Sequence, residues 1–289
     1  MKRKITKVLI FGLSGMLGRE FTDLLSRDKK FSIFGYNSKN SDITNFEGIW
    51  AIINKIKPDI VINCAAKINV DACELDPLGT WMVNSVGPGN IARCLRLSKK
   101  KCTLLQISSS DVFSGQGEGT YKENAVASPV NVYGWSKLAG EKLVEQELIN
   151  DKFVKYLIIR TGWLYGKFRN TFVENIVDSL KSNMPIRLVS DKYNIPTWTY
   201  DLVVAAMLLV NNNSKSGIYH LVSNGNKGAV SKYELAVYIS HVLGLKHNQL
   251  KRCKHRDIFK TVRATRIILV NSKTEILPDW EESIMRYLK

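Results

Sequence analysis

The chain has 289 residues, of which 45% are hydrophobic, enough for one large α/β domain or for a nucleotide-binding domain with a smaller second lobe. Its five cysteines are odd in number and show no C-x-x-C spacing, which favours neither a disulfide framework nor a zinc site and fits a reducing cytoplasm. The net charge of +16 is spread along the chain without a nucleic-acid-binding motif, and no apolar run is long enough to cross a bilayer. We therefore expect a cytoplasmic protein that binds neither nucleic acid nor membrane, and we predict no metal site.

A glycine-rich turn follows the first predicted strand. Residues 7–11 form an apolar run typical of a buried strand, and an amphipathic pattern predicts a helix after the turn. Glycines at this spacing let the backbone approach a pyrophosphate, whose charge lies at the helix N-terminus. The segment predicts a dinucleotide site with contacts from Gly12, Gly15, Met16, Leu17 and Gly18.

The loop after the second predicted strand, 31–34, contains no carboxylate. Many NAD-binding folds carry an acidic residue at this point for the ribose 2′-hydroxyl. The chain instead has Ser38 and Lys39, which suit a 2′-phosphate. This favours NADPH as the cofactor and leaves NADH open.

Two later helices have N-terminal signals. Thr44 and Glu47 have the spacing of a capping box for a helix through residue 56. The pair Asp76-Pro77 starts another helix in the preferred cap and first-turn order, and Asn84 lies within that helix. Between them is a third strand, 60–63, which ends in small residues that let a cofactor lie against the backbone but also serve tight packing.

The stretch 104–143 contains the reactive side chains of the chain. An apolar strand, 104–107, ends in three serines, and a predicted helix, 130–148, carries Tyr133 and Lys137 on one face. Free tyrosine has a pKa of about 10, and a nearby ammonium lowers it by stabilising the phenolate. Such a pair can move a proton to a carbonyl oxygen. A serine hydroxyl at the carboxyl end of a parallel strand would hydrogen-bond the same oxygen.

Strands alternate with helices through a fifth strand, 156–159, which predicts a Rossmann-type, doubly wound parallel sheet. The pattern changes after Tyr165-Gly166. We expect residues 1–165 to form the dinucleotide-binding domain, with segments near 196–222 returning to it, and residues 166–289 to form mainly a substrate-binding lobe. His220, at a strand end, is expected to be a packed residue and not a base.

Several motifs are shared with one known family. They are the turn of Gly12, Gly15 and Gly18, Asp42-Ile43-Thr44, Asn63-Cys64-Ala65-Ala66, Val70-Asp71, Val112-Phe113, Asn131-Val132-Tyr133-Gly134, Ser136-Lys137-Leu138-Ala139-Gly140-Glu141, the segment from Arg160 to Gly166, and Pro196-Thr197. Over nearly its whole length, the chain resembles the extended short-chain dehydrogenase/reductases, and within them the dTDP-4-dehydrorhamnose reductase family.

The resemblance implies reduction of the C4 ketone of a nucleotide-linked 4-keto-6-deoxy-hexose, giving an activated deoxysugar such as L-rhamnose. It implies that Tyr133 donates the proton, that Lys137 lowers the pKa of Tyr133 and holds the nicotinamide ribose, and that Ser109 hydrogen-bonds the carbonyl oxygen. Further cofactor contacts are implied for Asp42, Ile43, Cys64, Ala65, Ala66 and Asn84, and substrate contacts for Val70, Ser110 and Trp163.

The chain departs from the family pattern at three places. Ser108-Ser109-Ser110-Asp111 stands where the family reads Ser-Thr-Asp-Tyr, so serine replaces the family's aspartate at Ser110. Asp191-Lys192 replaces Asp-Gln, and Arg266-Ile267 replaces Arg-Pro. These departures leave the sugar stereochemistry and the choice between dTDP and UDP open.

Other functions are also compatible with the sequence. A nucleotide-sugar epimerase or dehydratase shares the serine, tyrosine and lysine, although a dehydratase needs an extra acid-base pair beside the serine. The regulatory beta subunit of methionine adenosyltransferase also resembles this family, so a non-catalytic NADP-binding subunit is an alternative. A homodimer is possible, because paired helices of this fold often make dimers.

Overall fold

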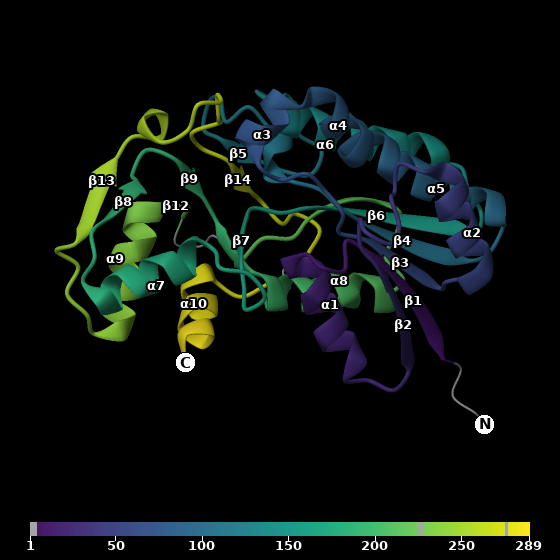
Figure 1. Ribbon diagram of the computed structural model, residues 1–289, viewed down its shortest axis with the longest axis horizontal. Coiled ribbons are helices and arrows are strands. Elements are labelled where there is room, and N and C mark those ends of the chain that lie inside the picture. The colour runs from purple at the N-terminus through teal and green to yellow at the C-terminus, as the bar shows by residue number, and fades with distance from the viewer. Residues whose placement is uncertain (1–4, 225–227, 275–276) are drawn as a thin grey trace.

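The computed structural model describes residues 5–224, 228–274 and 277–289. Its central strands are β1 (Thr6–Phe11), β2 (Phe31–Tyr36), β3 (Ile60–Asn63), β4 (Cys102–Ile107), β6 (Val154–Arg160) and β11 (Gly217–His220). They form one six-stranded parallel sheet in the order β11-β6-β4-β3-β1-β2 (Figure 1). The predicted fold class is confirmed.

Helices cover both faces of this sheet (Figure 1). One face carries α1 (Met16–Ser26) and α8 (Thr199–Asn211), and the other carries α2 (Phe46–Ile56), α5 (Gly87–Ser98) and α6 (Val132–Leu148). Because side chains alternate along a strand, Val8 and Ile10 of β1 pack with the α1 and α8 core. Leu9 and Phe11 pack with the core on the opposite face.

The sheet reverses its winding next to β1. This strand pairs with β2 on one side and with β3 on the other, and α1 and α2 cover opposite faces. In open α/β sheets, ligands bind beyond the carboxyl ends of the strands at such a switch point. The glycine turn after β1 and the small residues after β3 both lie at this edge.

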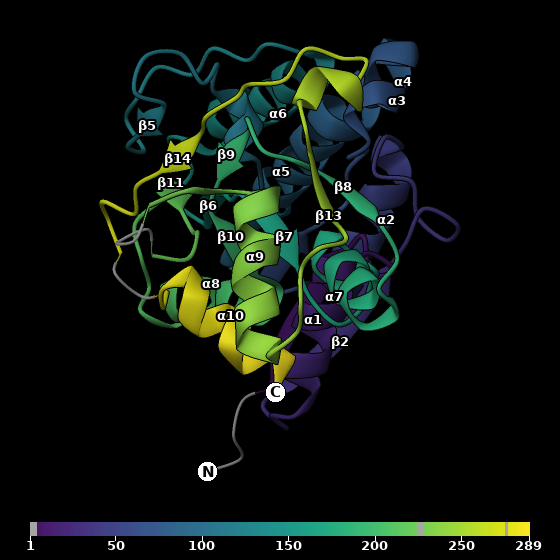
Figure 2. The ribbon, with the colours of Figure 1, turned by 90° about the vertical axis from the view of Figure 1, so that its left-hand side faces the viewer.

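A second core lies beside the sheet in the half of the molecule that faces the viewer in Figure 2. It contains α7 (Phe172–Ser182), α9 (Lys232–Leu243) and α10 (Trp280–Leu288), and β8 (Ile186–Val189) pairs with β13 (Leu250–Cys253). Three short pairs complete the strands: β5 (Thr120–Tyr121) with β14 (Ile268–Leu269), β7 (Trp163–Tyr165) with β10 (Pro196–Trp198), and β9 (Tyr193–Asn194) with β12 (Val230–Ser231). We call this half the lobe.

Several short helical segments connect these elements. They are α3 (Val70–Leu75), α4 (Pro77–Trp81), the π-helical segment η1 (Met82–Val86), and the 3₁₀ turns η2 (Ser110–Val112) and η3 (His255–Asp257). Asp76 caps α4 as predicted, because its side chain accepts a hydrogen bond from the Gly79 backbone. None of the helices in the described residues is long and apolar enough to span a membrane.

The predicted capping box at the start of α2 is wrong. Asn45 is the cap, and its side-chain oxygen accepts a hydrogen bond from the Gly48 backbone at 3.1 Å. Thr44 belongs to the preceding turn, where its backbone N–H donates to Asp42 at 2.9 Å. Asparagine is also the more favourable of the two residues at an N-cap.

Candidate active site

A groove of about 340 Å³ lies at the switch point of the sheet. Gly12 has a φ of +79°, and a Cβ on this residue would lie 2.6 Å from the Ala65 backbone nitrogen. A Cβ on Gly18 would lie 2.3 Å from the Gly12 carbonyl oxygen. The turn therefore packs directly against the end of β3, and the N-terminus of α1 faces the space that a pyrophosphate needs.

Most of the predicted cofactor residues lie together in this groove. Those that line it are Gly12, Gly15, Ser38, Asp42, Ile43, Cys64, Ala65 and Ala66. Met16 instead lines the neighbouring larger cavity, Leu17 is buried in the core under α1, and Lys39 lies exposed outside the groove wall. The lining fits a dinucleotide, because small residues make up most of it and let the backbone approach the ligand.

Asn84 does not line either cavity. Its side-chain oxygen accepts from the Lys67 backbone at 2.9 Å, and its amide donates to the Lys67 carbonyl at 2.9 Å and to Ser136 at 3.0 Å. Ser136 in turn donates to the Tyr133 carbonyl. The structure therefore places Asn84 as a buried brace between η1 and α6.

Arg19 is a cation near the groove that the sequence pattern did not identify. It lies exposed in the first turn of α1 and lines a shallow cavity together with Ser14 and Asn37. Both of these residues also line the dinucleotide groove. Arg19 therefore lies next to the part of the groove wall that Ser14 and Asn37 form.

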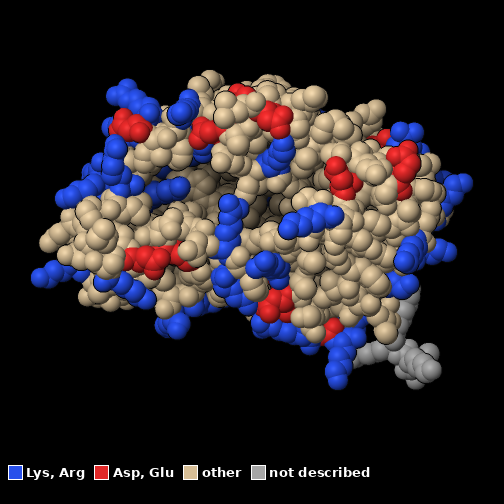
Figure 3. Space-filling model, viewed as in Figure 1, with Lys and Arg blue, Asp and Glu red and all other residues tan. Residues whose placement is uncertain are grey.

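A larger cavity of about 560 Å³ opens between the sheet and the lobe. Figure 3 shows this region as a hollow with Lys and Arg side chains at its margins. The predicted residues that line it are Val70, Ser109, Ser110, Tyr133 and Trp163. Lys137 lies behind this wall, where its ammonium donates to the Ile107 carbonyl at 2.7 Å.

Ser109 and Tyr133 face the cavity from two different elements. Ser109 follows β4, and its hydroxyl oxygen accepts from the Asp111 backbone N–H at 3.1 Å. Tyr133 lies in the first turn of α6, which Asn131 caps through the Gly134 backbone. Both side chains are more than nine-tenths buried, so their hydroxyls meet a ligand in a largely dry environment.

The expected lowering of the Tyr133 pKa is not seen in the structure. Burial raises the pKa of this phenol well above its usual range, and the charge of Asp111 adds to the effect while a hydrogen bond with Ser109 opposes it. Burial also lowers the pKa of Lys137 to about 8, with Glu141 opposing. The phenol is therefore held in its protonated form, which is the form that an acid catalyst needs.

Four cations line the large cavity, and local sequence patterns assigned none of them to the site. These cations are Arg169, Lys192, Lys232 and Arg263. The Lys232 ammonium lies 5.5 Å from the Trp163 ring centroid and 5.2 Å from that of Phe172. Burial lowers the pKa of Lys232 to about 8, and the charges of Lys192 and Arg263 add to this. These residues come from separate segments of the lobe, so no local motif links them.

A loop of the lobe is tied to the sheet half at the cavity mouth. The Asp71 carboxylate accepts from the Thr261 backbone at 3.0 Å and from Arg263 at 2.8 Å. Asn131 donates to the Val262 carbonyl at 3.1 Å. This arrangement fixes Arg263 in the cavity wall and neutralises its charge.

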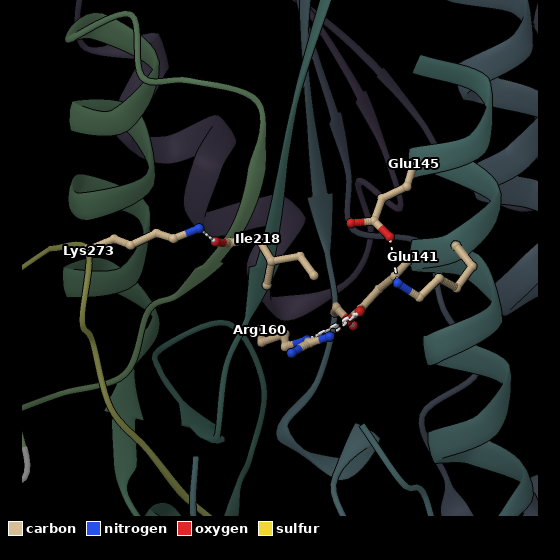
Figure 4. A network of polar contacts seen from close by, with 7 residues as sticks. Glu141, Glu145, Arg160, Ile218 and Lys273 are labelled. Carbon is tan, nitrogen blue, oxygen red and sulfur yellow. Dashed lines mark hydrogen bonds and ion pairs between the residues drawn. The ribbon is translucent and has the colours of Figure 1, made fainter. Parts of the chain in front are cut away.

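A buried ion pair lies under α6 (Figure 4). Glu141, one helical turn after Lys137, accepts hydrogen bonds from Arg160 at 2.9 and 2.6 Å. Ser108 donates to the same carboxylate. Both charged side chains are almost fully excluded from solvent, so the pair joins α6 to β6 directly beneath the serine run.

His220 is a packed residue, as predicted. It is fully buried, and its Nδ1 lies 3.1 Å from the Val270 carbonyl. Burial lowers its pKa to about 4, with the charge of Glu123 opposing. It does not line either cavity.

A dinucleotide groove at a switch point, with serine, tyrosine and lysine at the adjoining cavity, defines the short-chain dehydrogenase/reductase class. The family model described as the RmlD substrate binding domain matches residues 6–289. The chain therefore belongs to the dTDP-4-dehydrorhamnose reductase family, as the sequence predicted.

Named relatives agree with this assignment. The chain is 31% identical to a dTDP-4-dehydrorhamnose reductase of Aggregatibacter actinomycetemcomitans over 81% of its own length and 78% of the relative. It is 31% identical to the spore coat polysaccharide biosynthesis protein SpsK of Bacillus subtilis over 99% and 98%. A crystal structure of dTDP-4-dehydrorhamnose reductase from Bacillus anthracis in complex with NADP matches at a TM-score of 0.89, with 30% identity, covering 98% and 99%.

Proposed function

We propose that this protein is an NADPH-dependent reductase that converts the C4 ketone of a nucleotide-linked 4-keto-6-deoxy-hexose into an alcohol. The observation that carries the proposal is the cavity in which Ser109 and Tyr133 face one space, with the dinucleotide groove beside it. Relatives named as reductases of dTDP-4-dehydrorhamnose support the same reaction and the same cofactor.

The side chains divide the acid catalysis between them. NADPH, when bound, supplies the hydride. Ser109 donates a hydrogen bond to the carbonyl oxygen, since its own oxygen already accepts from the Asp111 backbone. Tyr133 then transfers its proton to the developing alkoxide. Lys137, whose ammonium is fixed on the Ile107 carbonyl, stabilises the phenolate that remains.

The cations of the cavity suit a diphosphate. The Asp71 carboxylate neutralises the charge of Arg263, and the negative charge of Asp111 stabilises the ammonium of Lys192. Arg169 and Lys232 have no carboxylate partner among the described residues. They match the single negative charge on each phosphate of a diphosphate diester. We infer that they hold the diphosphate of a dTDP- or UDP-sugar, with Trp163 and Val70 beside the sugar.

The two halves take different parts of the ligands. We propose that residues 1–165, with α8 and β11, form the dinucleotide-binding domain, and that 166–289 form mainly the substrate-binding lobe. In the dinucleotide groove, Ser38 and the nearby Arg19 would hold the 2′-phosphate, and Lys39 would reach it from the exposed loop. Asn84 would act indirectly by bracing α6.

Epimerase, dehydratase and regulatory-subunit functions receive less support. A dehydratase needs an acid-base pair beside the serine, and the Ser110 hydroxyl there accepts a hydrogen bond from Asn194 at 3.2 Å. A purely regulatory subunit has no use for Ser109 and Tyr133 in the wall of one open cavity.

The test is NADPH oxidation by the purified protein with 4-keto-6-deoxy-hexose nucleotides, with and without prior 3,5-epimerisation, in dTDP and UDP forms. Oxidation of the epimerised form alone would establish a rhamnose-type reductase and would name its nucleotide. NADPH binding without oxidation of any of these sugars would contradict the proposal.

The pH dependence should reflect Lys137. Its pKa of about 8 means that the side chain is charged below pH 8 and neutral above it, whereas burial keeps the Tyr133 phenol protonated throughout this range. We expect kcat/KM to be level below pH 8 and to fall as the pH rises beyond it, because kcat/KM reports ionisations of the free enzyme.

Two variants assign this fall to one lysine. Lys232 also has a pKa of about 8, so the fall must persist in Lys232→Met. In Lys137→Arg, whose guanidinium stays charged, only the part of the fall that comes from diphosphate binding by Lys232 should remain. A fall that persists in Lys137→Arg and vanishes in Lys232→Met would show that substrate binding, not proton transfer, is responsible.

Gly18→Ala should weaken cofactor binding. A Cβ here would lie 2.3 Å from the Gly12 carbonyl oxygen, so the backbone of the turn must move. We expect a loss of about 1–3 kcal/mol in the free energy of unfolding, the usual cost of overpacking, and a raised Kd for NADPH in a fluorescence titration. Gly48→Ala in α2 is the control, since its nearest contact is the Asn45 side chain at 3.3 Å. An unchanged Kd in Gly18→Ala would remove the turn from the cofactor site.

A further inference from the structure

Two side chains of opposite charge lie in the wall of the large cavity and have no role in the proton transfer. Asp111 follows directly after the serine run, and Lys192 comes from the bend between β8 and β9. Lys192 is only 8% exposed, and its ammonium makes no hydrogen bond with any other described residue. A buried ammonium without a hydrogen-bond partner is costly even with a carboxylate nearby, so Lys192 offers a free donor to a ligand in the cavity.

The carboxylate of Asp111 lies within electrostatic reach of two cavity groups. Burial lowers the pKa of Lys192, and the charge of Asp111 opposes that shift. The same charge contributes to raising the pKa of Tyr133. The Asp111 backbone is also held in place, because its N–H donates to the Ser109 hydroxyl at 3.1 Å. The acidic and basic groups therefore lie beside the hydroxyls that act on the ketone.

We propose that Asp111 and Lys192 together bind the hydroxyl on C3 of the sugar and so determine which sugars are reduced. This inference rests on the proposed function. Tyr133 acts on the oxygen at C4, so its neighbours meet the substituents of C3 and C5. In a 6-deoxy-hexose, C5 carries only the methyl group and the ring oxygen, whereas C3 carries a hydroxyl. One hydroxyl donates to a carboxylate and accepts from an ammonium, which satisfies both side chains.

The pair distinguishes this chain from its family pattern. In the family resemblance described above, Asp111 takes the place of a tyrosine in the motif that ends in Val112-Phe113, and Lys192 takes the place of a glutamine. The two changes lie far apart in the sequence but line one cavity. Ser110 replaces the family's aspartate, and its hydroxyl oxygen accepts a hydrogen bond from the Asn194 amide. The carboxylate in this region is therefore that of Asp111.

The test compares two substrates in five proteins. The substrates are the 4-keto-6-deoxy-hexose nucleotide and its 3-deoxy counterpart, and the proteins are the wild type, Asp111→Asn, Lys192→Gln, the double variant Asp111→Asn/Lys192→Gln and Lys232→Gln. We expect the wild type to show a kcat/KM about 10- to 100-fold lower for the 3-deoxy sugar, the effect of losing a hydrogen bond to charged groups. In the double variant this ratio should approach unity, mainly because the 3-hydroxy sugar is reduced less well.

Lys232→Gln is the matched control. It removes a cation that we assign to the diphosphate, so kcat/KM should fall for both sugars and their ratio should stay as in the wild type. Each single variant also gives a ratio of kcat/KM for the two sugars. These ratios still test the inference if the double variant does not fold. An unchanged ratio in active Asp111→Asn and Lys192→Gln variants would overturn the inference alone. Failure of the wild type to reduce the 3-hydroxy sugar would overturn the proposed function and this inference with it.

Discussion

Replacing Tyr133 by phenylalanine is expected to lower kcat by about 10²- to 10⁴-fold, the usual contribution of a positioned acid catalyst. The ring packs against Val70 and Cys73, and phenylalanine preserves that contact. Only the hydroxyl beside Ser109 is lost. Because the dinucleotide groove is lined by other residues, the Kd for NADPH should remain close to that of the wild type.

The measurement is single-turnover NADPH oxidation with a parallel titration of cofactor binding. Tyr165→Phe is the matched control, since it deletes another buried phenolic hydroxyl. That hydroxyl has no hydrogen-bond partner in the described part of the chain and does not line the cavity. We expect Tyr165→Phe to keep its kcat. A wild-type rate in Tyr133→Phe would remove Tyr133 from the mechanism.

Arg160→Met is expected to reduce the free energy of unfolding by about 3–5 kcal/mol, the cost of leaving a buried charge without its partner. Glu141 would lose the three hydrogen bonds that Arg160 donates and would keep the one from Ser108. Arg160 also packs over the Phe113 ring, with the guanidinium carbon 5.0 Å from the ring centroid. Methionine retains part of that apolar contact, so the loss reports mainly on the ion pair.

The same helix offers the control for chemical denaturation. Lys142 forms an ion pair with Glu145 at 2.7 Å, but the Lys142 side chain is 65% exposed. Figure 4 shows Glu145 one turn along α6 from Glu141. Lys142→Met should change the free energy of unfolding by less than about 1 kcal/mol, as is usual for exposed pairs. A loss of similar size in both variants would show that the burial of the Glu141 pair adds nothing.

Local patterns in the sequence predicted the sheet and the glycine turn well. The apolar run 60–63 coincides with β3, and the Gly12 turn requires a positive φ that glycine alone adopts easily. These features depend on neighbours in the chain. The cap of α2 was misplaced because Thr44 and Asn45 both carry suitable oxygens, and only the backbone conformation decides between them.

Features that depend on distant segments could not be predicted in the same way. Lys232 is the first residue of α9, and nothing in its local sequence indicates that it packs against Trp163. The direction of the Tyr133 pKa shift depends on burial, which the spacing to Lys137 does not reveal. Asn84 was expected beside the cofactor, and its amide is instead used up within the protein.

The cavity between sheet and lobe also bears on how such enzymes diversify. Ser109 and Tyr133 belong to the sheet half, whereas Arg169, Lys192 and Lys232 belong to the lobe. Substitutions in the lobe can therefore change the wall of the cavity without disturbing Ser109 or Tyr133. One ancestral reductase could in this way give rise to descendants with different sugar preferences that keep Ser109 and Tyr133 and differ mainly in the lobe.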